Sequence, residues 1–286
     1  MEVEMSVKKL KVTTLVDNAV NSGGLLAEWG LSLLIETDQL NILFDCASTP
    51  TPFFHNINYL GVDLSVIDKI LLSHGHNDHT GSLDSIIKVI PKKPDIVSGC
   101  GGWHPRFYEE SWAGITHNKD YIQSLGGQLH EINETTRFTD DIVVMVNVPM
   151  ESGFESIDDN LYAKKDGQLV QDDFGDELAL SIKTDAGIVV FTGCAHRGIV
   201  NIVEHAKAST KCERVRAVIG GSHLMNANDS RIKKTIAYFK DMGVETIALS
   251  HCTGDKAAVA FGTAFKDSFI FNKAGLVIDL LKDDIL

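Results

Sequence analysis

The stretch from Ser73 to Gly81 concentrates side chains that bind metal ions. It reads Ser-His-Gly-His-Asn-Asp-His-Thr-Gly, so three imidazoles and a carboxylate fall within six residues. Neutral imidazole and carboxylate are ligands for zinc, iron or manganese. Because His74 and His76 are two residues apart, their rings can converge on one ion from an extended loop. Asp78 and His79 follow where the chain turns and can point to a second ion.

The flanking sequence gives this stretch a structural context. Residues 66–72 have the apolar composition of a largely buried strand, and residues 81–90 carry apolar side chains at helical spacing. The histidines therefore belong to a turn between the carboxyl end of a strand and the start of a helix. Layered α/β folds usually place their chemistry there. A histidine-rich surface loop is the alternative, and four ligands in this context disfavour it.

The stretch resembles the His-x-His-x-Asp-His signature of the metallo-β-lactamase superfamily, and the following Thr-Gly and helix are similar too. The resemblance implies an α/β fold, a four-layer αββα sandwich, with a site for two divalent metal ions at one edge. We expect zinc, with iron or manganese as alternatives. The flavodiiron branch carries Glu at the second ligand position. His76 stands there in this chain, which favours hydrolytic chemistry over oxygen reduction.

Composition narrows the classes of partner. The chain has 286 residues, enough for one domain with a large core, and its net charge is −13 from 39 acidic and 26 basic residues. Phosphate backbones require basic tracts, so we expect no nucleic-acid partner and a small-molecule substrate instead. A homo-oligomer is compatible with the sequence, which leaves the oligomeric state open.

Sequence features at the terminus and at the cysteines bear on location. Residues 1–6 are polar and acidic, so we expect no signal peptide. No stretch of about 18 apolar residues is present, so no membrane span and no membrane partner are expected. Five cysteines without framework spacing fit a reducing cytoplasm.

The first part of the chain predicts an antiparallel meander that leads to the metal-binding stretch. Residues 10–18, 31–36 and 41–46 have strand character and are joined by short polar turns. Asp45 ends the third strand close to where the metal loop should lie. It is a candidate for orienting a ligand histidine, and capping the next helix is the alternative. That helix is expected over residues 51–65, and a short strand over 95–98.

Two less regular regions interrupt the single predicted domain like lids, around residues 99–133 and 150–177. The first suits short helices over 105–112 and 118–125, and its Trp103, His104 and Trp112 are candidates for substrate contact or for ordinary surface packing. The second is acidic, and Lys-Asp-Gly at 165–167 predicts a hairpin turn.

The resemblance also directs attention to the second half of the chain. Superfamily members typically carry a Gly-His-Thr loop, then two strands, of which the second ends in Thr-Gly-Asp. The histidine binds the first metal and the aspartate bridges both. Here residues 192–194 read Thr-Gly-Cys, so the resemblance implies that Cys194 takes the bridging position, where a thiolate can serve. The expected histidine is missing. Asp176 lies closest by spacing, with Glu177 adjacent, and His196 is the rival for this third ligand.

Two further histidines follow predicted strands. His223 lies in Gly-Gly-Ser-His-Leu, where several superfamily hydrolases carry a histidine that acts as a general acid, and a histidine that merely ends a strand is the alternative. His251 lies in Ser-His-Cys-Thr-Gly, where the resemblance places the last metal ligand. With Asp78, His223 completes the expected catalytic pair.

These motifs are most similar to a prokaryotic branch of metal-dependent hydrolases that includes dihydropteroate-type synthases of methanopterin assembly. The resemblance implies a hydrolase in which a metal-bridged hydroxide attacks an ester, thioester or phosphoester. One alternative is a synthase that displaces pyrophosphate. Another is a non-catalytic metal-binding or redox-sensing protein, which Cys194 and the missing histidine favour.

Overall fold

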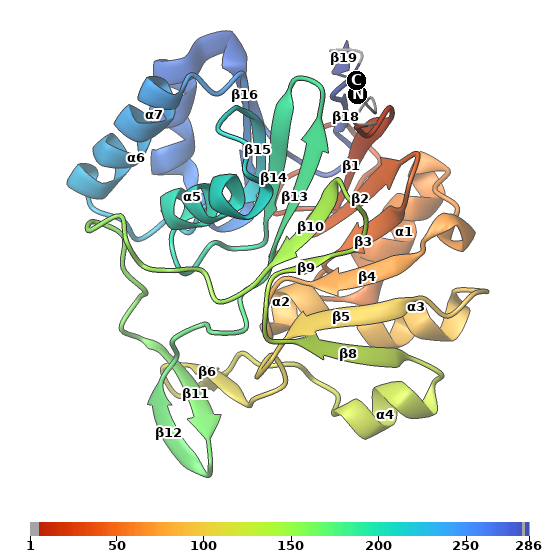
Figure 1. Cartoon of the computed structure of the whole chain (residues 1–286). Coiled ribbons are helices and arrows are strands. Elements are labelled where there is room, and N and C mark those ends of the chain that lie inside the picture. The colour runs from red at the N-terminus through yellow and green to blue at the C-terminus, as the bar shows by residue number, and fades with distance from the viewer. Residues whose placement is uncertain (1–5, 282–283, 286) are drawn as a thin grey trace.

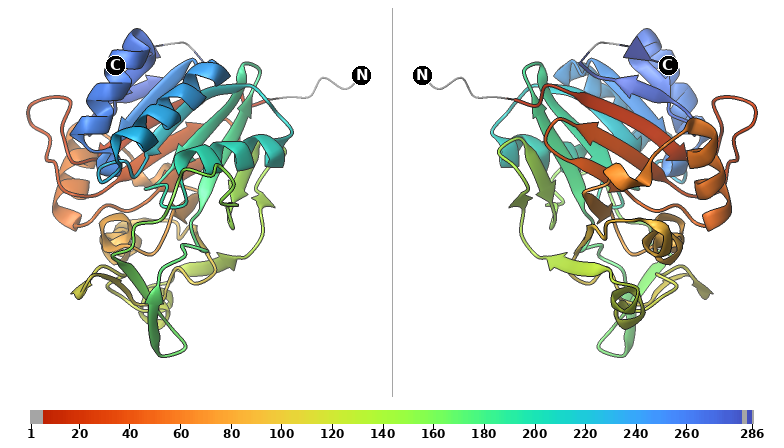
Figure 2. Two further views of the ribbon diagram at one scale, coloured as in Figure 1. Left: turned by 90° about the vertical axis from the view of Figure 1, so that its left-hand side faces the viewer. Right: turned by 90° about the vertical axis from the view of Figure 1, so that its right-hand side faces the viewer.

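Two large sheets lie face to face, and helices cover the outer face of each (Figure 1). The computed structural model describes residues 6–281 and the backbone of 284–285. Residues 1–5, most of the segment in which no signal peptide is expected, lie outside the described residues. The helix-sheet-sheet-helix order confirms the predicted αββα sandwich. Figure 2 shows each helical layer from its own side.

The first sheet has eight strands, and the meander expected near the start of the chain forms its antiparallel half. The four neighbouring strands β3, β4, β5 and β8 run parallel. In spatial order they are β19 (Asp284–Ile285), β18 (Val277–Asp279), β1 (Leu10–Val16), β2 (Ser32–Thr37), β3 (Asn41–Phe44), β4 (Lys69–Leu72), β5 (Asp95–Gly99) and β8 (Gln128–Ile132).

The second sheet has seven strands and repeats this mixed pattern. The strands from β14 to β17 are parallel, and the rest pair antiparallel. In spatial order they are β17 (Phe269–Phe271), β16 (Thr246–Ser250), β15 (Val215–Gly221), β14 (Gly187–Thr192), β13 (Ala179–Thr184), β10 (Ile142–Met145) and β9 (Thr136–Arg137).

Helices bury the outer faces of both sheets. The first sheet is covered by α1 (Pro50–Leu60), α3 (Leu83–Val89) and α4 (Lys119–Ser124). The second is covered by α5 (Ile199–Thr210), α6 (Asp229–Met242) and α7 (Asp255–Phe265). The helix α2 (Asn77–Thr80) belongs to the metal-binding stretch. Single 3₁₀ turns lie at Leu64–Val66, His251–Thr253 and Lys266–Ser268.

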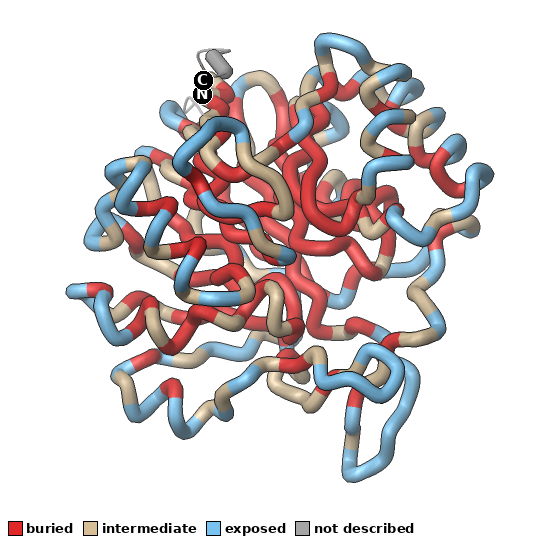
Figure 3. Tube along the Cα trace, turned by 180° about the vertical axis from the view of Figure 1, so that it is seen from behind, coloured by how far each residue is buried: buried red, intermediate tan, exposed pale blue. Residues whose placement is uncertain are grey.

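Alternation along the strands divides the apolar side chains among three buried clusters. In β2, Leu33 and Ile35 point into the core between the sheets, whereas Leu34 packs beneath the helices. In β14, Phe191 points inward and Val190 outward. Because both faces are covered, these strands read as continuous apolar runs. Figure 3 shows the buried residues gathered along the middle of the molecule.

The two lid-like regions meet in a small third sheet, seen at the bottom of Figure 1, of β12 (Gln168–Gln171), β11 (Leu161–Lys165), β6 (Arg106–Tyr108) and β7 (Ser111–Trp112). The helix predicted over 105–112 was wrong. Pairing of β6 with β11, more than 50 residues away in sequence, holds this segment extended. The helix predicted over 118–125 is confirmed by α4.

Turn residues explain two other outcomes. The predicted hairpin at residues 165–167 is confirmed, because Asp166 and Gly167 have φ values of 51° and 80° between β11 and β12, as a type I′ turn requires. The helix predicted over 51–65 ends early, at Leu60, because Gly61 adopts a left-handed conformation with φ 68°. Within the described residues, no helix has the length and hydropathy to cross a bilayer.

Candidate metal centre

Side chains from both sheets meet at the carboxyl ends of the parallel strands. His74 and His76 follow β4 in the first sheet, whereas Cys194 and His196 follow β14 in the second. His251 follows β16, two strands from β14. Parallel strands deliver their carboxyl ends to one edge, so residues far apart in sequence converge there.

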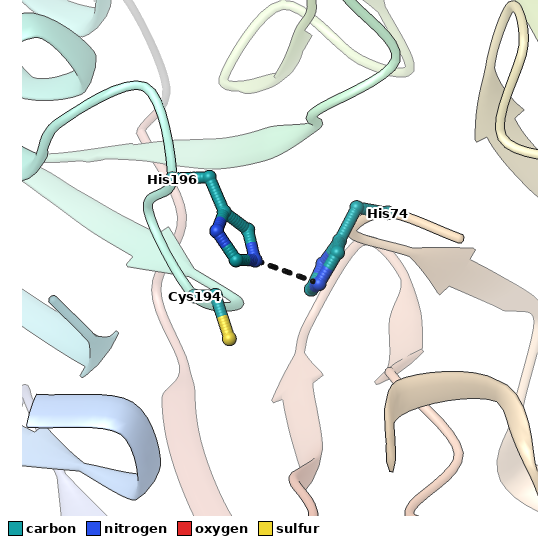
Figure 4. Close-up of side chains that lie close together, drawn as sticks. All are labelled: His74, Cys194 and His196. Carbon is teal, nitrogen blue, oxygen red and sulfur yellow. Dashed lines mark hydrogen bonds between the residues drawn. The ribbon is translucent and has the colours of Figure 1, made fainter. Parts of the chain in front are cut away.

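Three histidines form the first group of potential metal ligands. His74 Nε2 lies 3.0 Å from His76 Nδ1 and 3.2 Å from His196 Nε2. All three side chains are buried. In Figure 4 the rings of His74 and His196 point toward each other from opposite sides of the site. Three nitrogens converging at these distances can act as ligands of one ion.

A carboxylate and two histidines form the second group. His251 Nε2 lies 3.2 Å from His79 Nε2 and 3.2 Å from Asp78 Oδ2. Asp78 Oδ2 is 3.8 Å from His79 Nε2. Asp78 and His79 come from α2 in the first sheet's half, and His251 from the second sheet's half. The second group therefore also spans both halves of the fold.

Cys194 stands between the two groups. Its sulfur lies within 4.8 Å of the ligand nitrogens of His74 and His196, and also of those of His79 and His251. The distance from Sγ to His79 Nε2 is 3.1 Å. The structure thus places the thiol where a ligand shared by two ions would stand.

The outer nitrogens of two ligand histidines have acceptors of their own. His74 Nδ1 lies 2.9 Å from Ser73 Oγ, and His251 Nδ1 lies 3.0 Å from Asn18 Oδ1. With the Nδ1 proton donated outward, the Nε2 lone pair of each ring faces the site. This tautomer, assigned from the acceptors, is the one that binds a metal through Nε2.

Asp45 organises the metal loop. It accepts hydrogen bonds from Ser73 N at 2.7 Å, from Ser73 Oγ at 2.7 Å and from His79 Nδ1 at 2.6 Å. It does not cap the following helix, whose N-cap is Thr49. Its backbone is left-handed, with φ 63°. One buried carboxylate thus fixes the end of β4 and the ring of His79 together.

Burial sets the protonation of the three histidines in the first group. Burial lowers the pKa of His74 and of His196 well below the usual range, and neighbouring imidazoles act in the same direction. Burial also lowers the pKa of His76, to about 3. These rings are therefore neutral at pH 7, as a metal requires. Burial raises the pKa of the Cys194 thiol, so a thiolate there needs cations beside it.

Asp176, predicted as the third ligand of the first ion with His196 as its rival, lies near the site but has other partners. The Arg106 guanidinium pairs with Asp176 Oδ1, and Gly75 N donates to Oδ2 at 3.2 Å. Within residues 6–281, the buried clusters of potential ligands contain His196 and not Asp176. The adjacent Glu177 accepts hydrogen bonds from His196 N at 2.6 Å and from Arg197 N at 2.8 Å.

Arg106 was missed by sequence reasoning, because no motif marks it. It is 1% exposed and pairs with Asp172 and Asp176 of the second lid-like region. Through Asp176 and Gly75 this ion pair reaches the loop between His74 and His76. A basic residue between Pro105 and Phe107 gave no signal of burial in the sequence.

A cavity of about 320 Å³ opens beside the ligands. His223, whose side chain is nearly buried, lies on its wall with Nε2 3.3 Å from Asp158 Oδ2. Its ring centroid is 4.1 Å from that of His196. Burial alone would lower the pKa of His223, but the Asp158 carboxylate and the Cys252 sulfur raise it to about 10. A protonated imidazole therefore faces the cavity.

The lid-like regions contribute different residues to this cavity than the sequence suggested. Tyr108 and Leu161 line it from the small sheet. Trp103, His104 and Trp112, which were candidates for substrate contact, are absent from its lining. Trp29, from the loop between β1 and β2, also borders it, and the sequence had given no reason to single it out.

Known proteins are similar to this chain in sequence and in fold. A family model described as the metallo-beta-lactamase superfamily matches residues 30–164. A Methanocaldococcus jannaschii protein named 7,8-dihydropterin-6-methyl-4-(beta-D-ribofuranosyl)-aminobenzene-5'-phosphate synthase is 34% identical over 290 residues, which cover 95% of this chain and 97% of that protein. The chain belongs to the metallo-beta-lactamase superfamily.

Two solved structures agree with this membership. Tm1679, described as a metal-dependent hydrolase of the beta-lactamase superfamily, has a TM-score of 0.82 and 26% identity, covering 94% of this chain and 98% of its own. The metallo-beta-lactamase fold protein YhfI from Bacillus subtilis has a TM-score of 0.56 and 16% identity, covering 95% and 100%. At that identity, the second likeness shows the fold alone.

The ligand groups predict how substitutions will change metal content. His196→Ala removes one of three nitrogens from the first group. Loss of a residue that only hydrogen-bonds to a metal ligand typically lowers metal affinity by about 10- to 100-fold. Loss of the ligand itself should therefore lower the affinity of the protein for that ion by more than this. Elemental analysis after dialysis against a weak chelator should then give about one ion per chain where the parent keeps two.

Two control variants separate this loss from a general disturbance. His205→Ala removes a half-buried histidine on α5, outside both groups, and should keep both ions. Asp176→Asn should also keep them, although it weakens the pairing with Arg106. Loss of an ion from Asp176→Asn but not from His196→Ala would contradict the assignment.

Proposed function

We propose that this protein is a dinuclear metal-dependent hydrolase that acts on an ester, thioester or phosphoester bond of a small molecule. The observation that carries the proposal is the position of Cys194 between two ligand groups, at the floor of a cavity. The cavity of about 320 Å³ suits a small molecule. The net charge of −13 makes a nucleic-acid substrate unfavourable.

The donor sets fit two divalent ions. His74, His76, His196 and the Cys194 sulfur would hold the first ion, and Asp78, His79, His251 and the same sulfur the second. Imidazole and thiolate together favour zinc, with iron and manganese as alternatives. Bound there, the ions would lower the pKa of a water molecule and polarise the bond under attack.

The chain's own residues supply the rest of the chemistry. Asp78 holds its carboxylate ionised, because His79 and His251 lower its pKa against the effect of burial. His223 holds a proton on Nε2, next to Asp158. That proton is available to the departing oxygen of the substrate, and Asp158 stabilises the imidazolium before transfer.

A synthase is the second candidate function, favoured by the relative named as an aminobenzene-phosphate synthase at 34% identity. In that case an amine would replace water as the attacking group and pyrophosphate would leave. Reactions with and without an arylamine acceptor separate the two, because the synthase forms a new C–N bond and the hydrolase does not.

A non-catalytic metal-binding or redox-sensing protein is the third candidate, and observed turnover would decide against it. The metal-loaded protein should hydrolyse at least one member of a panel of carboxylic esters, thioesters and phosphoesters. Asp78→Ala should lower kcat by more than about 100-fold, because even the partners of metal ligands contribute 10- to 100-fold. Its far-UV circular dichroism should match that of the parent, since the apolar core does not depend on the site.

Asp84→Ala is the matched control for this test. Asp84 lies at the start of α3, six residues from Asp78, and pairs with Lys88. Its removal should leave kcat within a factor of a few. Near-normal turnover by Asp78→Ala, or no turnover of any substrate by the loaded parent, would contradict the proposal.

His223→Ala tests the proton donor. General acid assistance typically contributes about 10²–10⁴ in rate, so kcat should fall by that order for a poor alkoxide leaving group. Nitrophenolate departs without a proton, so the fall in kcat for a nitrophenyl substrate should be much smaller. Equal losses for both leaving groups would rule out the acid role, and loss of a metal ion would make His223 a ligand.

A further inference from the structure

An exposed tryptophan stands beside the candidate metal centre. Trp29 is 51% exposed and lines the cavity. Its ring centroid lies 5.2 Å from that of His251, with the planes tilted by 52°. An indole left half open to water presents apolar surface whose burial by a ligand would be favourable. The structure leaves this surface open next to the proposed reacting centre.

The loop that carries Trp29 is anchored on both sides of it. Glu28 N donates to Asp17 O at 3.2 Å, and Gly30 N donates to Asn18 Oδ1 at 3.2 Å. The Glu28 carboxylate accepts hydrogen bonds from two further backbone amides, those of residues 48 and 49. The backbone is therefore fixed where the indole is exposed. A rigidly held aromatic side chain binds a flat partner at low entropic cost.

Beyond the metal ligands, the cavity offers apolar surface and little charge. Tyr108, 46% exposed, and Met225, 39% exposed, line it together with Leu161. The described lining contains no Lys or Arg, and its second carboxylate, Asp158, is paired with His223. A substrate portion that extends away from the ions therefore meets aromatic and aliphatic side chains.

We infer that the substrate carries a planar aromatic or heteroaromatic ring, which stacks on the indole of Trp29 while the scissile group reaches the metal centre. This inference rests on the proposed function, because it assigns the substrate class of the same site. Aromatic rings prefer offset or edge-to-face contact with centroids about 4.5–7 Å apart. Such a pair stabilises the complex beyond the gain from buried area. Trp29 would thereby select flat substrates over aliphatic ones of similar size.

Two non-hydrolysable ligands with the same anionic group test the ring directly. Phenylphosphonate and cyclohexylphosphonate differ in the flatness of a six-membered ring. Calorimetric titration of the metal-loaded full-length protein should show phenylphosphonate binding roughly 2- to 12-fold more tightly, the range expected for aromatic pairing. Trp29→Leu should abolish that preference, and Trp29→Phe should retain most of it.

Trp112→Leu is the matched control, because Trp112 is also half exposed, at 50%, yet packs against Phe107 outside the cavity lining. Its ligand preference should equal that of the parent. Equal affinities in the parent, a preference that survives in Trp29→Leu, or no binding of either ligand would overturn the inference.

Titration after metal removal distinguishes the two claims. Metal-dependent binding of both phosphonates with equal affinity would overturn the ring inference and leave the proposed function standing. A phenyl preference that needs Trp29 but persists without metal, in a protein that turns over no substrate of the panel, would support the ring inference and overturn the proposed function.

Discussion

The sulfur of Cys194 can stand between two ligand groups only because two sheets hold their loops at a fixed separation. The first sheet supplies His74 and His79, and the second supplies Cys194. The apolar core between the sheets sets that spacing, because close-packed interiors deform little. At the junction a Cβ on Gly193 would collide with Ser73 Oγ, so only glycine lets the two loops approach this closely.

The site concentrates unfavourable features that its surroundings must offset. Left-handed backbone occurs in loops that follow strands at the site, at Asp45, Ala195, His223 and His251 among others. Such conformations typically persist where the structure around them over-determines the chain, often at functional sites. Buried neutral imidazoles and a buried thiol add a desolvation cost. Two divalent cations would offset both by satisfying the inward lone pairs and stabilising the thiolate.

Local spacing explains which parts of the fold and of the site could be predicted from the sequence. The cluster from His74 to His79 lies within one turn, so its spacing was accessible without tertiary information. His251 was assigned from the resemblance to the superfamily, at the end of a predicted strand. The choice between Asp176 and His196 was not accessible from the sequence, because it depends on Arg106, 70 residues away from Asp176. The helix prediction for residues 105–112 failed for the same reason, because the strand pairing of this segment is long-range.

The shared sulfur is tested most directly by titrating the metal-free full-length protein with cobalt(II) and following the sulfur-to-cobalt charge-transfer absorption. If Cys194 binds both ions, the absorption rises through two equivalents. It should be absent from Cys194→Asp, which still binds two ions through a bridging carboxylate. Absorption that saturates after one equivalent, or that persists in Cys194→Asp, would contradict a thiolate shared between the two ligand groups.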